Sequence, residues 1–259
     1  MQDKIYNSIY KDKKYVDIDL PDYKITDSKS LKGNKILVVG VGTARDTKYL
    51  AVANDVHGID ISARATSIAK KFNVKTVVSR INKKIQYKDD EFDVVVAKDI
   101  LEHIENPLLL LEELRRVTKK TGYIVLSVPN HFYITFRLRN LLGKNLIWKT
   151  LGHDHTKLFE EWDYMHLRFF TWNGFQKMIR KAKLKIVKEF WDFGTLAHYS
   201  QPEMVISYHR QLETNYYVVE FLKIIWKLFN TVLPRKIRSL IVKLSPNLLS
   251  AGFYVWVKK

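Results

Sequence analysis

The stretch KILVVGVGTARDTKYLAVANDVHGID, residues 35–60, decides the fold. Its apolar run over 36–39 leads directly into a glycine turn, which predicts a fully buried strand of a parallel sheet. A helix is expected over 44–52 and a second strand over 55–60. A strand, a turn, a helix and a second strand make up the βαβ unit from which parallel sheets are built.

Strands and helices continue to alternate after this unit. Ser62 is a candidate N-cap for the next helix, and Asn106 with Pro107 opens a leucine-rich helix further along. The spacing predicts helices over 62–72 and 107–117 and strands over 74–78, 92–97 and 122–128. Such an alternation is typical of a Rossmann-like, doubly wound parallel α/β sheet.

The pattern changes beyond the fifth expected strand. A long segment rich in aromatic residues and histidine precedes an expected helix over 172–182 and a strand over 185–191. Long insertions of this kind are commonly functional lids. A last strand is expected over 253–257, and before it two amphipathic helices are expected over 216–244, interrupted at Pro234.

Length and composition bound the class of protein. The 259 residues, 46% of them hydrophobic, suffice for one elaborated domain with its own core. Cysteine is absent, which excludes disulfides, thiolate metal sites and a cysteine nucleophile. Residues 1–34 contain no apolar run typical of a signal peptide, so we expect an N-terminal lead-in. No apolar stretch is long enough to span a bilayer, and we expect a cytoplasmic protein.

The net charge is +17, from 44 Lys and Arg against 27 Asp and Glu. Such an excess favours polyanionic partners, either nucleic acid or an anionic lipid surface. The basic residues are spread along the whole chain, so a generally lysine-rich composition explains the same excess. The charge therefore does not choose between these partners.

The glycine turn and the end of the second expected strand together predict a nucleotide site. Gly40 and Gly42 allow a sharp turn and let backbone N–H groups approach a ligand. Asp60 closes the second strand, where a carboxylate accepts hydrogen bonds from the ribose hydroxyls of an adenosine. Arg45 stands where dinucleotide-binding folds usually present a third glycine, which leaves a dehydrogenase as a distant alternative.

Three segments resemble class I S-adenosylmethionine-dependent methyltransferases. The first is KILVVGVGTARDTKYLA, which is similar to the family's first motif. The second, FDVVVAKDILEHIENPLLLLEELRRVTKKTGYIVLSVPN at 92–130, resembles its fourth strand, Leu-Glu-His segment, helix and fifth strand. The third, HLRFFTWNGFQKMIRKAKLKIV at 166–187, is similar to the segment before the sixth strand in ubiquinone-type and cell-surface-saccharide methyltransferases.

This resemblance implies a particular domain organisation. The sheet has seven strands and the last strand is antiparallel. After the lead-in at 1–34, the methyltransferase domain spans 35–259. It contains a lid insertion at 131–184, after the fifth strand, and an amphipathic helical insertion at 195–250, between the sixth and seventh strands.

The resemblance also implies a set of cofactor-binding residues for S-adenosylmethionine. Two glycines line the amino-acid end of the cofactor, a carboxylate holds its ribose, backbone serves its adenine, and a second carboxylate faces its sulfonium. The implied residues are Gly40, Gly42, Asp60, Ile61, Ile81 and Asp99. Val38, Ala44 and Arg80 depart from the family pattern, which leaves a non-catalytic scaffold protein as an alternative.

Methyl transfer from a sulfonium is an in-line displacement, for which the enzyme aligns acceptor, methyl and sulfur. An oxygen or nitrogen acceptor that loses a proton also benefits from a general base. The candidate catalytic residues are Asp99, His103, His131 and His166. For His103, packing within its segment is the alternative. The histidine pair in residues 152–156 lacks an identifiable third ligand, so no metal site is expected there.

The sequence therefore predicts a methyltransferase for a small-molecule, glycan or lipid-linked acceptor. An RNA methyltransferase is the alternative that the charge favours, although no RNA-binding module is recognisable. Residues 216–244 predict a peripheral contact at the inner membrane face, with packing against the domain or a dimer partner as the alternative. Both a monomer and a homodimer remain open.

Overall fold

The computed structural model describes most of the predicted sheet and parts of the two insertions. The described residues are Asn7, Tyr10, 31–44, 47–81, 84–134, Arg137, Leu141, 166–191, Val232, 234–250 and 252–259. The chain divides into two compact units, and each is described by itself. The first unit comprises 1–128, 174–189 and 254–259, and the second comprises 129–173 and 190–253. Most of the predicted lid and the predicted helix over 216–233 lie outside the described residues.

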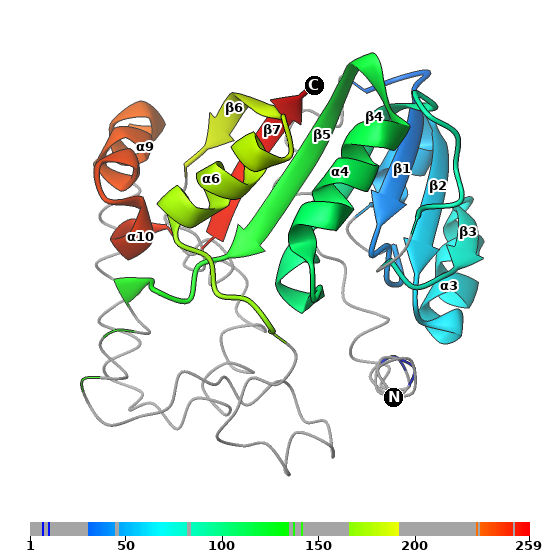
Figure 1. Ribbon diagram of the computed structural model, residues 1–259, viewed down its shortest axis with the longest axis horizontal. Coiled ribbons are helices and arrows are strands. Elements are labelled where there is room, and N and C mark those ends of the chain that lie inside the picture. The colour runs from blue at the N-terminus through cyan, green and yellow to red at the C-terminus, as the bar shows by residue number, and fades with distance from the viewer. Residues whose placement is uncertain are drawn as a thin grey trace. The chain divides into compact units, whose positions relative to one another are not determined.

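A seven-stranded sheet forms the first unit (Figure 1). Its strand order is β3-β2-β1-β4-β5-β7-β6, and the last strand in the chain, β7, is antiparallel. The predicted Rossmann-like fold of seven strands is therefore confirmed. The strands are β1 (Lys35–Val39), β2 (Asp55–Asp60), β3 (Lys75–Val78), β4 (Phe92–Lys98), β5 (Thr118–Pro129), β6 (Lys185–Phe190) and β7 (Gly252–Lys258).

The two central strands carry uninterrupted apolar runs because they are covered on both faces. β1 pairs in parallel with β2 on one side and with β4 on the other. Ile36, Leu37 and Val39 on β1 are completely buried, as are Val95 and Val96 on β4. Since parallel strands share one direction, their carboxyl ends lie along one edge of the sheet. This carboxyl edge is where ligands bind in open α/β sheets.

The helices of the first unit begin where their caps predict. α4 (Pro107–Val117) begins after Asn106, whose side chain accepts a hydrogen bond from the backbone N–H of Leu109. α3 (Ala63–Ala69) begins after Ser62, whose hydroxyl accepts from the N–H of Ala65. A short 3₁₀ turn, η3 (Lys70–Phe72), follows α3, and α6 (Trp172–Lys181) precedes β6. Both predicted N-caps are therefore confirmed.

The predicted helix over 44–52 is wrong at Ala44, its first residue. The described part of this segment contains only a 3₁₀ turn, η2 (Lys48–Val52). Ala44 has a φ of 59°, in the left-handed region, so it cannot occupy a right-handed helical turn. The helix prediction failed because the chain leaves the glycine turn in a conformation that propensity does not reveal.

β5 is longer than predicted and contains an irregularity. It spans Thr118–Pro129, and its pairing with β4 shifts register between Phe92 and Val94. A Cβ on Gly122 would lie 2.6 Å from the backbone oxygen of Asp93, closer than any side chain allows. Glycine is therefore required at this position, where the two backbones approach each other.

An arginine fastens the loop before β4 to α4 at the opposite, amino edge of the sheet. The guanidinium of Arg116 donates to both carboxylate oxygens of Glu113, at 2.8 Å each. It also donates to the Asp89 carboxylate and to the carbonyls of Tyr87 and Ile85. Every one of these bonds is charge-assisted, and the Arg–Glu pair is bidentate, the strongest form of such a contact.

The second unit contains the short helices α9 (Arg235–Leu244) and α10 (Pro246–Leu249). Asn130, which is fully buried, donates to the carbonyls of Ser250 and Asn247 at 2.6 and 3.0 Å. Its side-chain oxygen accepts from the N–H of Phe132. Asn130 thereby ties the segment after β5 to α10. Among the described residues, no helix has the length and apolar character needed to cross a bilayer.

Candidate cofactor-binding site

A buried carboxylate joins the glycine turn to the start of α3. One oxygen of Asp60 accepts a hydrogen bond from the backbone N–H of Gly42, at 2.8 Å. The other oxygen accepts from the N–H of Ser62, also at 2.8 Å. Asp60 is only 7% exposed. Each carboxylate oxygen has two lone pairs, so the carboxylate retains acceptor capacity for a ligand after these bonds are made.

Two opposing effects act on the ionisation of Asp60. Burial raises its pKa above the ordinary value, because the charged form loses solvation. Hydrogen bonds from the backbone of Ser62, Gly42 and Ile61 act in the other direction, and burial outweighs them. A hydroxyl donor that reaches this carboxylate would supply the solvation that water does not.

The glycine turn has the conformation that only glycine adopts without strain. Gly40 has a φ of 75° and Gly42 a φ of 51°. A Cβ on Gly40 would lie 3.0 Å from Cδ1 of Ile100, the residue that follows Asp99 beyond β4. The turn therefore passes close to the β4–η4 connection. Its N–H groups donate within the fold, those of Gly40 and Val41 to the Ile59 carbonyl and that of Gly42 to Asp60.

Asp99 lies at the tip of β4, as predicted, in a strained conformation. Its φ is 49°, and its side chain is exposed. The hydroxyl of Ser127, on the neighbouring strand β5, donates to the Asp99 carboxylate at 2.8 Å. The backbone N–H of Asp99 lies 3.0 Å from the same hydroxyl oxygen and 3.1 Å from the Ser127 carbonyl. Non-glycine residues in this region of φ are concentrated at functional sites.

Ile61 and Ile81, the other predicted cofactor residues, also lie at the carboxyl edge. Ile61 follows Asp60 directly, and its backbone is among the groups that hydrogen-bond the carboxylate. Ile81 is 9% exposed and follows β3. The backbone N–H of Ser79 donates to the carbonyl of Asp60, which holds the end of β3 beside the end of β2.

Two residues of the N-terminal segment contact this site, which the sequence did not predict. The side-chain oxygen of Asn7 accepts from the Ser62 hydroxyl at 2.7 Å and from the N–H of Arg64 at 3.2 Å. The Arg64 side chain donates to the carbonyl of Tyr10. The Tyr10 hydroxyl lies 3.0 Å from the position that a Cβ on Gly42 would take. No sequence signal distinguishes these two residues from their polar neighbours.

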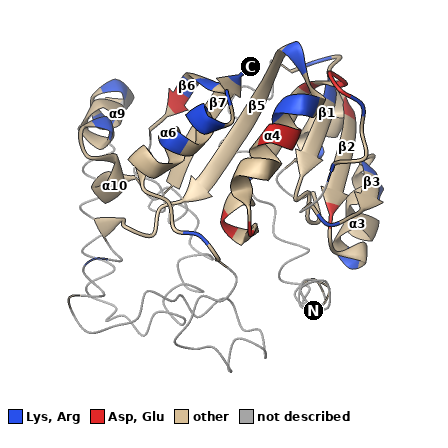
Figure 2. Ribbon diagram, in the orientation of Figure 1, with Lys and Arg blue, Asp and Glu red and all other residues tan. Residues whose placement is uncertain are grey.

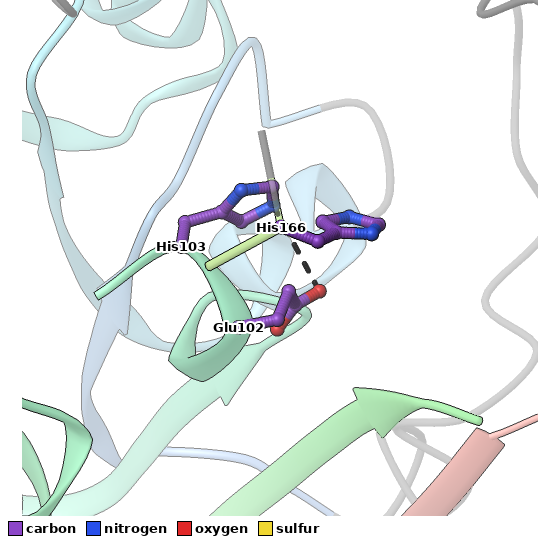
Figure 3. Close-up of side chains that lie close together, drawn as sticks. All are labelled: Glu102, His103 and His166. Atoms are coloured by element: carbon purple, nitrogen blue, oxygen red, sulfur yellow. Dashed lines mark ion pairs between the residues drawn. The ribbon is translucent and has the colours of Figure 1, made fainter. Parts of the chain in front are cut away.

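The Leu-Glu-His segment forms a 3₁₀ turn, η4 (Leu101–His103), at the same edge. Glu102 is 1% exposed, and its carboxylate lies 3.8 Å from Nε2 of His103 (Figure 3). His166, which is also drawn in Figure 3, belongs to the second unit. A role for His103 in catalysis stays a prediction, and its carboxylate neighbour fits the packing alternative equally well.

Two predicted catalytic histidines meet within the second unit. Nε2 of His131 lies 2.8 Å from Nδ1 of His166, although the two residues are 35 positions apart in the chain. His131 is 8% exposed, and the ring of Phe169 lies 4.5 Å from its ring, centroid to centroid. In such a pair, one imidazole donates the N–H of the hydrogen bond and the other imidazole accepts it. The histidines at 153 and 155 lie outside the described residues.

Comparison with known proteins identifies the fold that carries this site. Residues 37–126 match a family model described as "Methyltransferase domain". The chain carries a class I S-adenosylmethionine-dependent methyltransferase domain. The match covers the glycine turn, Asp60, Asp99 and α4 of the methyltransferase. The predicted family is confirmed, and S-adenosylmethionine is the cofactor of this family.

Individual proteins resemble this chain over different lengths. An uncharacterised protein of Methanocaldococcus jannaschii is 27% identical over 201 residues, which are 74% of this chain and 75% of that protein. A ubiquinone biosynthesis O-methyltransferase of Dechloromonas aromatica is 32% identical over 108 residues, 39% of this chain and 47% of that enzyme. The chain thus spans about half the length of this second relative.

A solved structure supports the fold over most of the chain. The S-adenosylmethionine-dependent methyltransferase of Mesorhizobium loti has a TM-score of 0.55 and is 11% identical to this chain. The superposition covers 90% of this chain and 96% of that one. At this low identity the likeness concerns the fold alone.

Proposed function

We propose that this methyltransferase transfers the methyl group of S-adenosylmethionine to a hydroxyl group of a small-molecule or lipid-linked acceptor. The observation that carries the cofactor half of the proposal is the pair of hydrogen bonds from Gly42 and Ser62 to the buried Asp60 carboxylate. This pair places a carboxylate with remaining acceptor capacity at the carboxyl edge of β2, beside the glycine turn.

The residues present fit the cofactor. Asp60 would hold the ribose hydroxyls, which donate to a carboxylate as the backbone N–H groups already do. Gly40 and Gly42 would let backbone approach the amino-acid end of the cofactor, and backbone at Ile61 and Ile81 would hold its adenine. The exposed carboxylate of Asp99 would face the positive sulfonium. When bound, S-adenosylmethionine supplies a methyl group that is already activated for displacement.

The acceptor half of the proposal is supported by the histidine pair of the second unit. A hydroxyl acceptor must lose a proton as it attacks, and a neutral imidazole is the usual base near neutral pH. His131 follows the end of β5 by two residues, and its hydrogen bond to His166 fixes the orientation of its ring. His131 would accept the acceptor's proton, and His166 would act through His131 as a positioning residue.

The choice of a hydroxyl acceptor agrees with one named relative. The enzyme of Dechloromonas aromatica is a ubiquinone biosynthesis O-methyltransferase. Since the match covers 47% of that enzyme, the acceptor of this chain belongs to the proposal. A glycan hydroxyl would make the same demand on the histidine pair as a phenolic one.

Calorimetric titration with S-adenosylhomocysteine tests the cofactor half. We expect saturable binding to the parent protein and a loss of at least about tenfold in affinity for Asp60→Asn, because one charge-assisted hydrogen bond contributes about 1.5–3 kcal/mol. Asp55→Asn is the matched control, since Asp55 begins the same strand at the opposite edge of the sheet. Its affinity is expected to equal that of the parent.

The two variants separate binding from folding. If Asp60→Asn unfolds the protein, its circular dichroism spectrum reveals this and the titration of Gly42→Val replaces it. A folded parent protein that binds neither S-adenosylhomocysteine nor S-adenosylmethionine contradicts the proposal. Incubation of the parent with isotopically labelled methyl donor and a cell extract, followed by mass spectrometry, identifies the acceptor. Label found on nitrogen or carbon would contradict the hydroxyl assignment.

A further inference from the structure

Helix α9 carries an apolar stripe that the described residues leave exposed. Ile237, Leu240 and Leu244 occur at helical spacing, so they share one face of the helix. Their exposed fractions are 45%, 60% and 79%. In an ordinary surface helix this stripe would face the core. In α9, by contrast, the three apolar side chains of the stripe are exposed.

The other face of α9 contacts the protein. Val242 is completely buried, and Arg238 and Ser239 are partly buried. At 3.6 residues per turn, Val242 lies roughly opposite Leu240 and Leu244 on the helix. The buried side of the helix therefore contains an arginine and a serine, while the described residues leave its most apolar side uncovered.

The charged residues of α9 all have one sign. Its sequence, RKIRSLIVKL, contains four basic residues and no acidic residue. Lys236 and Lys243 are exposed and lie beside the apolar stripe, roughly a quarter turn from its centre. Figure 2 shows the basic segments of α9 without an acidic neighbour on the helix. Long lysine side chains at such positions reach from an apolar surface to charged groups above it.

A second copy of the chain is a poor partner for this face. A two-fold contact through the stripe would bring Lys236 and Lys243 of one copy against the same residues of the other, and like charges in an interface oppose association. The whole chain has a net charge of +17, which disfavours self-association in the same way. An anionic lipid surface offers both an apolar layer for the stripe and negative charge for the lysines.

We propose that α9 docks the protein on an anionic membrane surface, with Ile237, Leu240 and Leu244 inserted at the headgroup boundary. Lys236 and Lys243 then contact anionic headgroups beside the inserted stripe. This docking is a property of the second unit and does not depend on methyl transfer. It is reversible, because one short helix buries far less apolar surface than a spanning segment.

Vesicle flotation with the full chain and without cofactor tests the proposal. The probes are vesicles of phosphatidylcholine alone and of phosphatidylcholine mixed equally with phosphatidylglycerol. We expect the parent to float with the anionic vesicles and to remain in solution with the neutral ones. Binding to neither, or equal binding to both, overturns the proposal.

Paired substitutions assign the binding to α9. Leu240→Gln with Leu244→Gln should lower the affinity for anionic vesicles at least about tenfold, because two inserted side chains become polar. Val52→Gln with Leu109→Gln is the matched control, since these side chains are 85% and 53% exposed in the first unit. If both pairs reduce binding equally, or neither does, the assignment to α9 is wrong.

The charge component has its own matched pair. Lys236→Glu with Lys243→Glu should lower the affinity at least about 25-fold, from about fivefold for each lysine near an anionic surface. Lys70→Glu with Lys71→Glu changes the net charge equally and should have a much smaller effect. Analytical ultracentrifugation excludes the other occupant: a dimeric parent that becomes monomeric on Leu240→Gln with Leu244→Gln would assign the stripe to a second copy and overturn the proposal.

Discussion

The two edges of the sheet in the first unit are built on opposite principles. At the amino edge, Arg116 donates to two carboxylates and two carbonyls at once, and the Glu113 carboxylate also accepts a hydrogen bond from the N–H of Ile85. At the carboxyl edge, Asp60 is buried without a cationic partner among its described hydrogen bonds. The first arrangement satisfies its charges, and the second leaves acceptor capacity unused.

Positive φ does not distinguish the edges, because Asn73 and Asp90, which precede β3 and β4 at the amino edge, also have positive φ. At the carboxyl edge, Gly40, Gly42, Ala44 and Asp99 all have positive φ. Non-glycine residues in this region cost about 1–3 kcal/mol each, so the strain there must be offset by the rest of the fold. From the difference in hydrogen bonding we expect the amino edge to stabilise the domain and the carboxyl edge to bind the ligand, and three predictions test this division.

The largest effect is expected from the arginine at the amino edge. Arg116→Ala removes five hydrogen bonds and leaves the partly buried carboxylate of Glu113 without its cation. We expect the free energy of unfolding to fall by about 3 kcal/mol or more. Urea denaturation measures this loss. The affinity for S-adenosylhomocysteine, measured under conditions where the variant is folded, should not change.

The exposed Arg180 on α6 provides the control, because Arg180→Ala should change stability by less than about 0.5 kcal/mol. A weakened cofactor affinity in folded Arg116→Ala would break the division between the edges. So would an Arg116→Ala variant as stable as the parent.

Intermediate effects are expected from one glycine at each edge. Gly122→Ala places a Cβ 2.6 Å from the backbone oxygen of Asp93, and Gly40→Ala forces alanine into a φ of 75° beside Ile100. Each should lower the free energy of unfolding by about 2 kcal/mol. Only Gly40→Ala should also weaken S-adenosylhomocysteine binding, by at least about tenfold, because its Cβ would occupy space beside the predicted amino-acid end of the cofactor. Equal affinities for the two variants would remove the glycine turn from the site.

The smallest effect concerns the dependence of stability on pH. Hydrogen bonds from Arg116 lower the pKa of Glu113, against the raising effect of burial. Its stabilisation is therefore fully present above its ordinary pKa of 4.5 and is lost as the pH falls through the lowered value. Burial raises the pKa of Asp60, so its contribution declines as the pH rises above 3.8. The two carboxylates have opposite slopes.

Stability measured between pH 3 and pH 6, a range of about three units around these carboxyl pKa values, separates the two groups. Glu113→Gln should flatten the rise of stability with pH, and Asp60→Asn should steepen it. Identical profiles for both variants would contradict the assignment of opposite environments to the two edges.

Local signals predicted much of the first unit. Asn106 and Ser62 cap their helices because a short polar side chain can accept from the first turn of a helix regardless of what surrounds it. The helix predicted over 44–52 failed because Ala44 adopts a left-handed conformation, which alanine does not adopt by preference. The N-caps could be predicted because each depends on residues within three positions of the cap, whereas the conformation of Ala44 does not follow from its local sequence.

The sequence named candidate site residues, and their contacts with one another could not be predicted from it. Asp60 was expected to meet a ligand, and the structure shows in addition that it holds the glycine turn and α3 together. Asn7 was not predicted, because its partner Ser62 lies 55 positions away and no pattern links the two. The meeting of His131 with His166 was likewise beyond any sequence spacing.

The sequence by itself predicted the order of most strands and helices and the family, because apolar periodicity, caps and a glycine turn act over a few residues. Only the tertiary structure decided that the apolar stripe of α9 is exposed and that Arg116 hydrogen-bonds the loop before β4. These outcomes depend on which groups of distant segments compete for burial. Which side chains become buried depends on packing between segments that are distant in the sequence, and a residue's sequence neighbours do not determine that packing.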